Sequence, residues 1–216
     1  MAWDTEGTKR KILDAAAVEL ASKGPDGTTI EQIARLACVN KERVYKYFGG
    51  KAELFALVIR EKLAAVEQVV PVSSCTPDGL AEYAGQLFDF AGAHPELVRL
   101  ILWESLAFTG EVPGEQFRRE FYGAKTDAFR EAQDVGLISG DLPPDHLNFM
   151  LIALAVYWVA APQVSRMMTG TEGSQPAERA RRRASVVEAA RRLVEPAAGL
   201  EPGESAAGSP PRVATL

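Results

Sequence analysis

The sequence has little of what most enzymes and secreted proteins need. Its 216 residues include only two cysteines and two histidines, and neither the cysteines nor the histidines have the spacing of metal ligands or of a Cys-x-x-Cys pair. It also lacks the motifs of nucleophile elbows, phosphate-binding loops, dinucleotide folds and zinc proteases. We therefore expect no catalytic residues, no cofactor and no metal site. Such sparse cysteine usage is typical of a reducing cytoplasm.

Long apolar segments are also missing. Residues 1–10 contain no apolar core of a signal peptide. The longest apolar run, residues 147–161, contains Asn148 and is shorter than the roughly 18 residues of a membrane span. We expect a cytoplasmic protein without membrane contact, in which this run forms a buried helix.

Negative charge dominates the chain but not its beginning. The net charge is −5, and 47% of the residues are hydrophobic, which is enough for a sizeable core. Residues 1–60 hold ten Lys/Arg and eight Asp/Glu, whereas residues 61–216 hold fourteen and twenty-one. Because most of the chain repels a polyanion, contact with DNA would be confined to the N-terminal part.

Residues 28–51 (TTIEQIARLACVNKERVYKYFGGK) contain two short helical patterns separated by a turn. The first has apolar residues at i, i+3, i+4 and i+7, namely Ile30, Ile33, Ala34 and Ala37. Thr28 and Glu31 have the spacing of a capping box at its start. The second begins after Asn40, a residue that favours the N-cap position, and turns Val44 and Phe48 inward. Two such helices predict a helix-turn-helix, whose second helix enters the major groove of DNA.

The second of these helices is basic and carries tyrosines. Residues 28–51 hold five Lys/Arg against two Asp/Glu. Thr28 at a helix N-terminus suits a phosphate, and Arg43 can read a guanine with two hydrogen bonds. The candidate DNA-binding residues are Thr28, Lys41, Glu42, Arg43, Tyr45, Lys46, Tyr47 and Lys51.

With these motifs the chain resembles the TetR-type one-component transcriptional regulators. The resemblance covers at least residues 8–62 and rests on KILDAAAVELASKG, TTIEQIA and VYKYFGGKAELF. It implies an all-α fold, with a three-helix DNA-binding domain followed by a helical ligand-binding and dimerisation domain. It further implies that Lys51 binds a phosphate, that the last two helices pair with those of a second copy, and that an inducer pocket lies among the C-terminal helices.

Three positions depart from the family pattern. The family commonly has Gly where Cys38 stands, Ser or Asn where Gly50 stands, and often a small residue where Glu42 stands. A carboxylate facing DNA either accepts a hydrogen bond from cytosine or is repelled by phosphate. Glu42 therefore either tunes the choice of operator or abolishes binding. The Cys38 thiol, next to a helix N-terminus, raises the further hypothesis of a redox sensor.

Helical patterns continue through the rest of the chain. We expect helices over residues 8–23, 51–70, 78–93, 95–108, 113–135, 144–168 (kinked at Pro162) and 176–195, after a loose arm at residues 1–7. The predicted division is a DNA-binding domain at residues 1–50, a connecting helix at 51–70, a ligand-binding and dimerisation domain at 71–195, and a disordered tail at 196–216, which is rich in Pro, Gly, Ala and Ser.

Aromatic residues are abundant enough in the second part to line an apolar pocket. The candidate pocket residues are Tyr83, Phe88, Trp103, Glu104, Phe121 and Tyr157. Trp103 beside Glu104 would place an aromatic wall next to a carboxylate, which suits a cation. The predicted ligand is a small-molecule inducer with apolar or aromatic character.

These observations predict a homodimeric DNA-binding transcriptional regulator, a ligand-responsive repressor of a palindromic double-stranded operator. The alternative is a helical protein that binds a small molecule or a partner and whose DNA-reading head no longer functions, which Glu42 would favour. A helical enzyme would need an acid/base or metal constellation that the sequence does not show.

Overall fold

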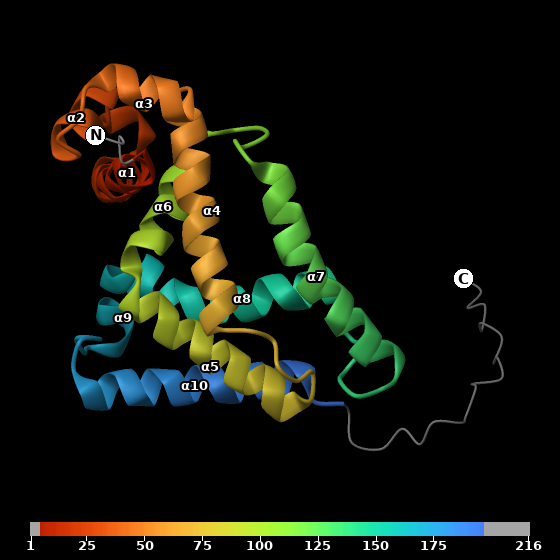
Figure 1. Cartoon of the computed structure of the whole chain (residues 1–216). Coiled ribbons are helices and arrows are strands. Elements are labelled where there is room, and N and C mark those ends of the chain that lie inside the picture. The colour runs from red at the N-terminus through yellow and green to blue at the C-terminus, as the bar shows by residue number, and fades with distance from the viewer. Residues whose placement is uncertain (1–4, 197–216) are drawn as a thin grey trace, which may run out of the picture.

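The computed structural model describes residues 5–196, and all regular structure within that range is helical. Ten helices follow one another there (Figure 1): α1 (Thr5–Gly27), α2 (Ile30–Leu36), α3 (Lys41–Phe48), α4 (Lys51–Val69), α5 (Pro77–Ala93), α6 (Pro95–Ala107), α7 (Glu115–Asp134), α8 (Pro144–Ala160), α9 (Pro162–Thr169) and α10 (Pro176–Val194). The all-α prediction is confirmed.

Helix ends agree with the sequence signals except in three places. Helix α1 begins at Thr5, so residues 5–7 are not part of a loose arm. Two helices meet at residues 160–162 with a bend of 85°, where the sequence predicted one kinked helix, because Pro162 cannot donate a backbone hydrogen bond and starts α9. Helix α7 begins at Glu115, two residues later than predicted. Residues 1–4 of the predicted arm and 197–216 of the predicted tail lie outside the described residues.

Helices α1, α2 and α3 form a small N-terminal head. Their inward faces bury Ile12, Leu20, Ile33, Val44 and Phe48, which is the apolar spacing that the sequence shows. Gly24 has a φ of +71° and interrupts α1 after Lys23, the residue at which the first helix was expected to end.

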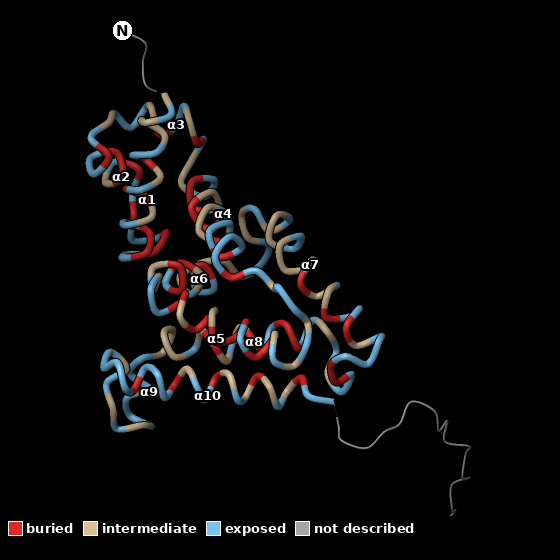
Figure 2. Tube along the Cα trace, turned by 60° about the horizontal axis from the view of Figure 1, so that its bottom comes forward, coloured by how far each residue is buried: buried red, intermediate tan, exposed pale blue. Residues whose placement is uncertain are grey.

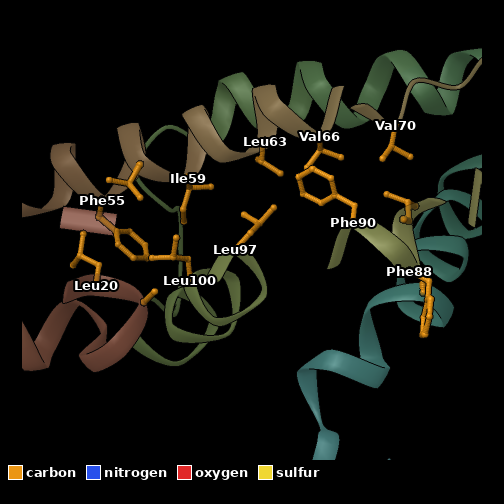
Figure 3. Close-up of a cluster of buried hydrophobic side chains, with 14 of the residues drawn as sticks. Leu20, Phe55, Ile59, Leu63, Val66, Val70, Phe88, Phe90, Leu97 and Leu100 are labelled. Atoms are coloured by element: carbon orange, nitrogen blue, oxygen red, sulfur yellow. The ribbon is translucent and has the colours of Figure 1, made fainter. Parts of the chain in front are cut away.

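Helix α4 connects the head to the remaining helices, which we call the body (α5 to α10). At its head end the Phe55 ring lies between Leu20 of α1 and Leu100 of α6 (Figure 3). Helix α6 also packs directly on α1. A methyl group on Gly24 would lie 2.6 Å from the Trp103 ring, so this glycine allows the close approach of α6. The head is thus packed on the body through α1, α4 and α6.

Helix α5 lies at the centre of the body. It packs against α10 on one side and α8 on another, and the buried positions of α5 and α8 show as red where the two helices run together (Figure 2). Helix α7 packs mainly on α8 (Figure 1) and meets α4 through side chains, among them the Lys125–Glu67 ion pair. Residues 70–76, which are not helical, connect α4 to α5. The domain division there remains a prediction.

No single helix within residues 5–196 is long and apolar enough to cross a membrane. Helices α8 and α9 would meet the length and composition of a span only as a pair, and the 85° bend lies between them.

Candidate nucleic-acid interface and ligand cavities

Helix α3 is held by its apolar side and offers its polar side to solvent. Val44 and Phe48 are buried one turn apart against α2 and α4. The side chains of Lys41, Glu42, Tyr45 and Lys46 are exposed. This is the arrangement that direct contact with DNA requires, since nothing has to unfold for these groups to reach a groove.

The two tyrosines of α3 differ in burial. Tyr45 is 50% exposed, whereas Tyr47 is partly buried, packs on the core and meets the Phe48 ring edge-on at 6.5 Å. Tyr47 is therefore the more rigidly positioned of the two. Arg43 is also half-buried, and Lys41 Nζ lies 3.3 Å from Glu31 Oε1 in an exposed pair that a phosphate could replace at little cost.

The prediction for Thr28 was wrong in its local geometry. Thr29, not Thr28, caps α2: its hydroxyl accepts from Gln32 N at 3.2 Å, and Gln32 Oε1 accepts from Thr29 N at 2.7 Å. Thr28 is completely buried, and its hydroxyl donates to Glu19 O at 3.2 Å. A buried hydroxyl with a partner is not available to a phosphate, so Thr28 instead ties the start of α2 to α1 within the head.

Lys51 stands at the start of α4, behind Gly50 at the N-cap position. Its ammonium donates to the carbonyl oxygens of Pro25 and, at 3.1 Å, Thr28. It therefore ties α4 to the segment between α1 and α2. An ammonium has three donors, so one remains for a phosphate, and this contact remains a prediction.

The turn between α2 and α3 contains the one non-glycine residue with positive φ in the described range, Cys38 at +56°. This is the position at which the resembling family commonly has glycine, and the left-handed conformation supplies the physical reason. The thiol is exposed. The redox role of Cys38 remains a hypothesis.

The body contains an inner cavity of about 160 Å³ enclosed by five helices, α4 to α8. Tyr83, Leu87 and Phe90 of α5 line it together with Phe121 of α7. Phe90 points toward Val66 of α4, whereas Phe88 points to the other side of α5 (Figure 3). Burial raises the pKa values of Tyr83 and Tyr122, so both phenols stay protonated donors at neutral pH.

Lys125 is the ammonium on the inner-cavity wall. It is buried, although its partner Glu67 is exposed, and Nζ lies 3.1 Å from Glu67 Oε2. It also lies 4.0 Å from the centre of the Phe121 ring, within the range of a cation–π contact. No sequence signal pointed to this residue, because a lysine in a polar helix is usually solvated.

An outer cleft of about 530 Å³ lies beside the inner cavity, where the ends of α5 and α8 and the loop before α10 meet the beginnings of α6, α9 and α10. It is lined by apolar residues such as Phe88 and Trp158 together with Arg99, Arg179 and Arg182.

The structure does not bring the predicted pocket residues together. Tyr83 and Phe121 line the inner cavity, and Phe88 lines the outer cleft. Trp103 instead packs on Gly24 of the head. Glu104 is buried in a two-bond pair with Arg118, with distances of 2.5 and 2.6 Å, so it offers no carboxylate to a cation. Tyr157 is 62% exposed on the opposite side of α8.

Tyr157 belongs to an apolar face on the outside of the body. Phe149, Met150 and Tyr157 of α8 are exposed there, as are Met167 and Met168 of α9. A groove of about 740 Å³ runs between α8, α9 and Leu193 of α10. A contiguous apolar surface of this kind is typical of a protein–protein interface.

Comparison with known proteins covers nearly the whole chain. Residues 12–58 match the model of the bacterial regulatory proteins of the tetR family, and residues 79–192 match the tetracyclin repressor-like C-terminal domain. The HTH-type transcriptional repressor SCO4008 of Streptomyces coelicolor is 39% identical over 200 residues, 90% of this chain and 98% of that protein.

Solved structures show the same fold. SCO4942 from Streptomyces coelicolor, assigned as a transcriptional regulator, superposes with a TM-score of 0.71 at 30% identity and covers 87% of this chain and 98% of its own. The crystal structure of AibR in complex with isovaleryl coenzyme A and operator DNA has a TM-score of 0.64, covers 84% of this chain and 97% of its own, and at 18% identity shows the fold alone.

Proposed function

The chain belongs to the tetR family of bacterial regulatory proteins and is a DNA-binding transcriptional repressor. From this premise we propose that it acts as a homodimer and releases a palindromic operator when a small molecule binds in the inner cavity of the body. The observation that supports the DNA-binding part of this proposal is the exposed polar side of α3. The protein would act in the cytoplasm, where the operator DNA is.

Within each subunit α3 enters a major groove. Lys41 and Lys46 contact phosphates, Arg43 reads a base edge, and Glu42 and Tyr45 add to the choice of sequence. Tyr47, held by Phe48, donates its hydroxyl to a phosphate. Lys51 adds the phosphate contact at the start of α4. The two-fold axis of the dimer sets half-sites about 34–36 Å apart, or a multiple of that distance.

The dimer would form through the exposed apolar face of α8 with α10 beside it. Tyr157 lies near the middle of this face. We expect Tyr157→Glu to convert the dimer to a monomer in sedimentation, because a desolvated carboxylate at an interface has no partner. Arg130→Glu, on the exposed side of α7, is the matched control. A dimer that persists in Tyr157→Glu would place the interface elsewhere.

Ligand response would use α6, which touches both parts. Its residues Leu97, Val98 and Ile101 line the inner cavity, and Trp103 packs on Gly24 of the head. A ligand that binds better to a displaced α6 shifts the protein toward the state that does not fit the operator, by its difference in affinity for the two states.

The first experiment is selection of bound sequences from a randomised duplex pool, repeated for Arg43→Ala and Tyr47→Phe. A palindrome is expected to emerge. Arg43→Ala should relax one base position at a cost of about 1–3 kcal/mol, and Tyr47→Phe should weaken all sequences evenly. Arg130→Ala, on α7, should change neither.

The salt dependence of DNA affinity distinguishes a head that binds DNA from one that does not. Each phosphate that the protein neutralises adds about 0.9 to the steepness with which log K falls against log salt. Lys46→Gln removes one such interaction and is expected to flatten the slope by that amount. If no sequence is enriched even at low salt, the head does not read DNA, and the alternative of a ligand-binding or partner-binding helical protein takes its place.

A further inference from the structure

The inner cavity and the outer cleft adjoin each other. Leu102 and Ala160 line both, and neighbouring residues of α5 and α6 divide between the two, as in Leu87 and Phe88, Ala91 and Gly92, and Val98 and Arg99. The inner cavity alone is smaller than the roughly 300–1,000 Å³ of typical small-molecule sites, whereas the two together lie within that range. One elongated molecule passing Leu102 and Ala160 would occupy both.

The inner cavity suits an uncharged apolar group. Leucine, valine, isoleucine and aromatic side chains make up most of its wall. Its one ammonium, Lys125, is balanced by Glu67 at 3.1 Å. A second anion placed there would have to compete with that carboxylate.

The outer cleft is lined by more guanidinium groups than carboxylates, although two of its arginines are paired with carboxylates, Arg182 with Glu178 and Arg179 with Asp89. Three arginines line it against one carboxylate, Glu172, which lies 3.6 Å from Arg166. Arg182 is 6% exposed and fixed: Nε donates to Glu178 at 2.8 Å, Nη2 donates to Thr171 O at 2.9 Å, and the guanidinium stands over the Trp158 ring. Arg182 therefore gives the cleft a positioned charge but few remaining donors.

Arg99 and Arg179 are the guanidinium groups available to a ligand. Arg99 is exposed, and among the described residues it makes no hydrogen bond or ion pair. Arg179 is half-exposed and held by long contacts of 3.2 and 3.3 Å to Asp89. Arginine binds phosphate and carboxylate through two parallel hydrogen bonds.

We propose that the ligand is an amphipathic organic anion, with a short apolar group in the inner cavity and a phosphate or carboxylate held by Arg99 and Arg179 in the outer cleft. The inference rests on the proposed function, since it names the class of molecule to which the repressor responds. It places the anion at the cleft and not at Lys125.

The test is titration calorimetry on the full chain without DNA, using hexyl phosphate, hexanoate, hexanol and inorganic phosphate. At least one of the two amphipathic anions should bind about tenfold or more tighter than both hexanol and inorganic phosphate, and the better of the two identifies the headgroup. Hexanol binding as tightly as both anions would overturn the proposal, as would inorganic phosphate binding as tightly as hexyl phosphate.

Variants locate the two ends of the ligand. Arg99→Gln should weaken anion binding about tenfold and leave hexanol unchanged, whereas the control Arg130→Gln should change neither. Ala160→Leu should narrow the passage and weaken hexyl phosphate but not inorganic phosphate. Lys125→Met weakening the anions more than Arg99→Gln would contradict the placement.

These experiments test binding of the ligand separately from its effect on operator affinity. Because DNA is absent from the calorimetry, a silent reading head leaves the binding result intact. If an amphipathic anion binds through Arg99 but does not lower operator affinity, the site stands and the ligand-responsive part of the proposed function falls.

Discussion

Helix α3 and the inner cavity are assembled in opposite ways. Helix α3 presents its exposed side chains within the eight residues Lys41–Phe48, whereas the inner cavity draws its wall from five helices between Leu63 and Ala160. A substitution on the exposed side of α3 changes what is read without disturbing a core, but a substitution in the cavity wall also changes packing. Operator choice can therefore vary more freely than ligand choice.

The head and the body also differ in how deeply their ion pairs are buried. The head keeps its ion pairs at the surface, such as Arg10 with Asp14 and Glu61, whereas the body buries the Arg118–Glu104 pair. Exposed pairs contribute little to stability, and removing one partner of a buried pair is costly. Glu104→Leu and Arg10→Gln test this contrast in charge, and the buried pair should give the larger change in stability.

Glu104→Leu should lower the free energy of unfolding by about 3–5 kcal/mol, because it leaves the Arg118 guanidinium buried without its carboxylate. Urea unfolding measures the loss. The double variant Glu104→Leu/Arg118→Met should recover most of it. A loss below about 1 kcal/mol in the single variant would mean that the body tolerates the charge as well as the surface does.

Gly24→Ala should destabilise the protein by about 2–4 kcal/mol, the combined cost of a left-handed alanine and of an added methyl group against Trp103. Gly110→Ala is the matched control, because nothing lies within 4 Å of its added methyl. Thermal unfolding of both variants measures the difference. Equal stability of the two would show that α6 can move away from the head at no cost.

Cys38→Gly should stabilise the head by about 1 kcal/mol relative to Cys38→Ala, because both remove the thiol but only glycine relieves the left-handed backbone at φ +56°. Chemical unfolding compares the two. If alanine and glycine give the same stability, the turn stores no strain.

Arg10→Gln should cost only about 0.2–1 kcal/mol, because its carboxylate partners are largely exposed. Its hydrogen bond holds the pKa of Asp14 below the ordinary value. The stabilisation is therefore present above that ordinary pKa and is lost as the pH falls through the lowered one. Unfolding curves of the two proteins should converge in acid, and a gap that widens there would contradict the assignment.

The head could be predicted closely from the sequence, because its signals are local. Apolar spacing placed Val44 and Phe48 inward, and the first helical segment is interrupted after Lys23, where the first helix was expected to end. The error at Thr28 shows the limit. Thr28 with Glu31 and Thr29 with Gln32 both have capping-box spacing, and only the burial of Thr28 beneath α1 decides between them.

The cavity could be predicted as a class of site but not residue by residue. Tyr83, Trp103 and Tyr157 are alike as aromatic residues on helices, yet they face the inner cavity, the head and the outer apolar face. Which side of a helix faces a cavity depends on how helices distant in sequence cross. The outer cleft could not be predicted from the sequence for the same reason, because Arg99 and Arg179 belong to different helices.

The position of Trp103 on α6 has a mechanical consequence. Ile101 lines the inner cavity and Trp103, two residues further along, touches Gly24. At a rise of about 1.5 Å per residue the two are separated by roughly 3 Å along the helix axis. Because a helix is stiff over that length, we expect a ligand that displaced Ile101 to shift Trp103 and its contact with the head as well. At that point the thickness of one helix, α6, would separate a ligand in the inner cavity from the head.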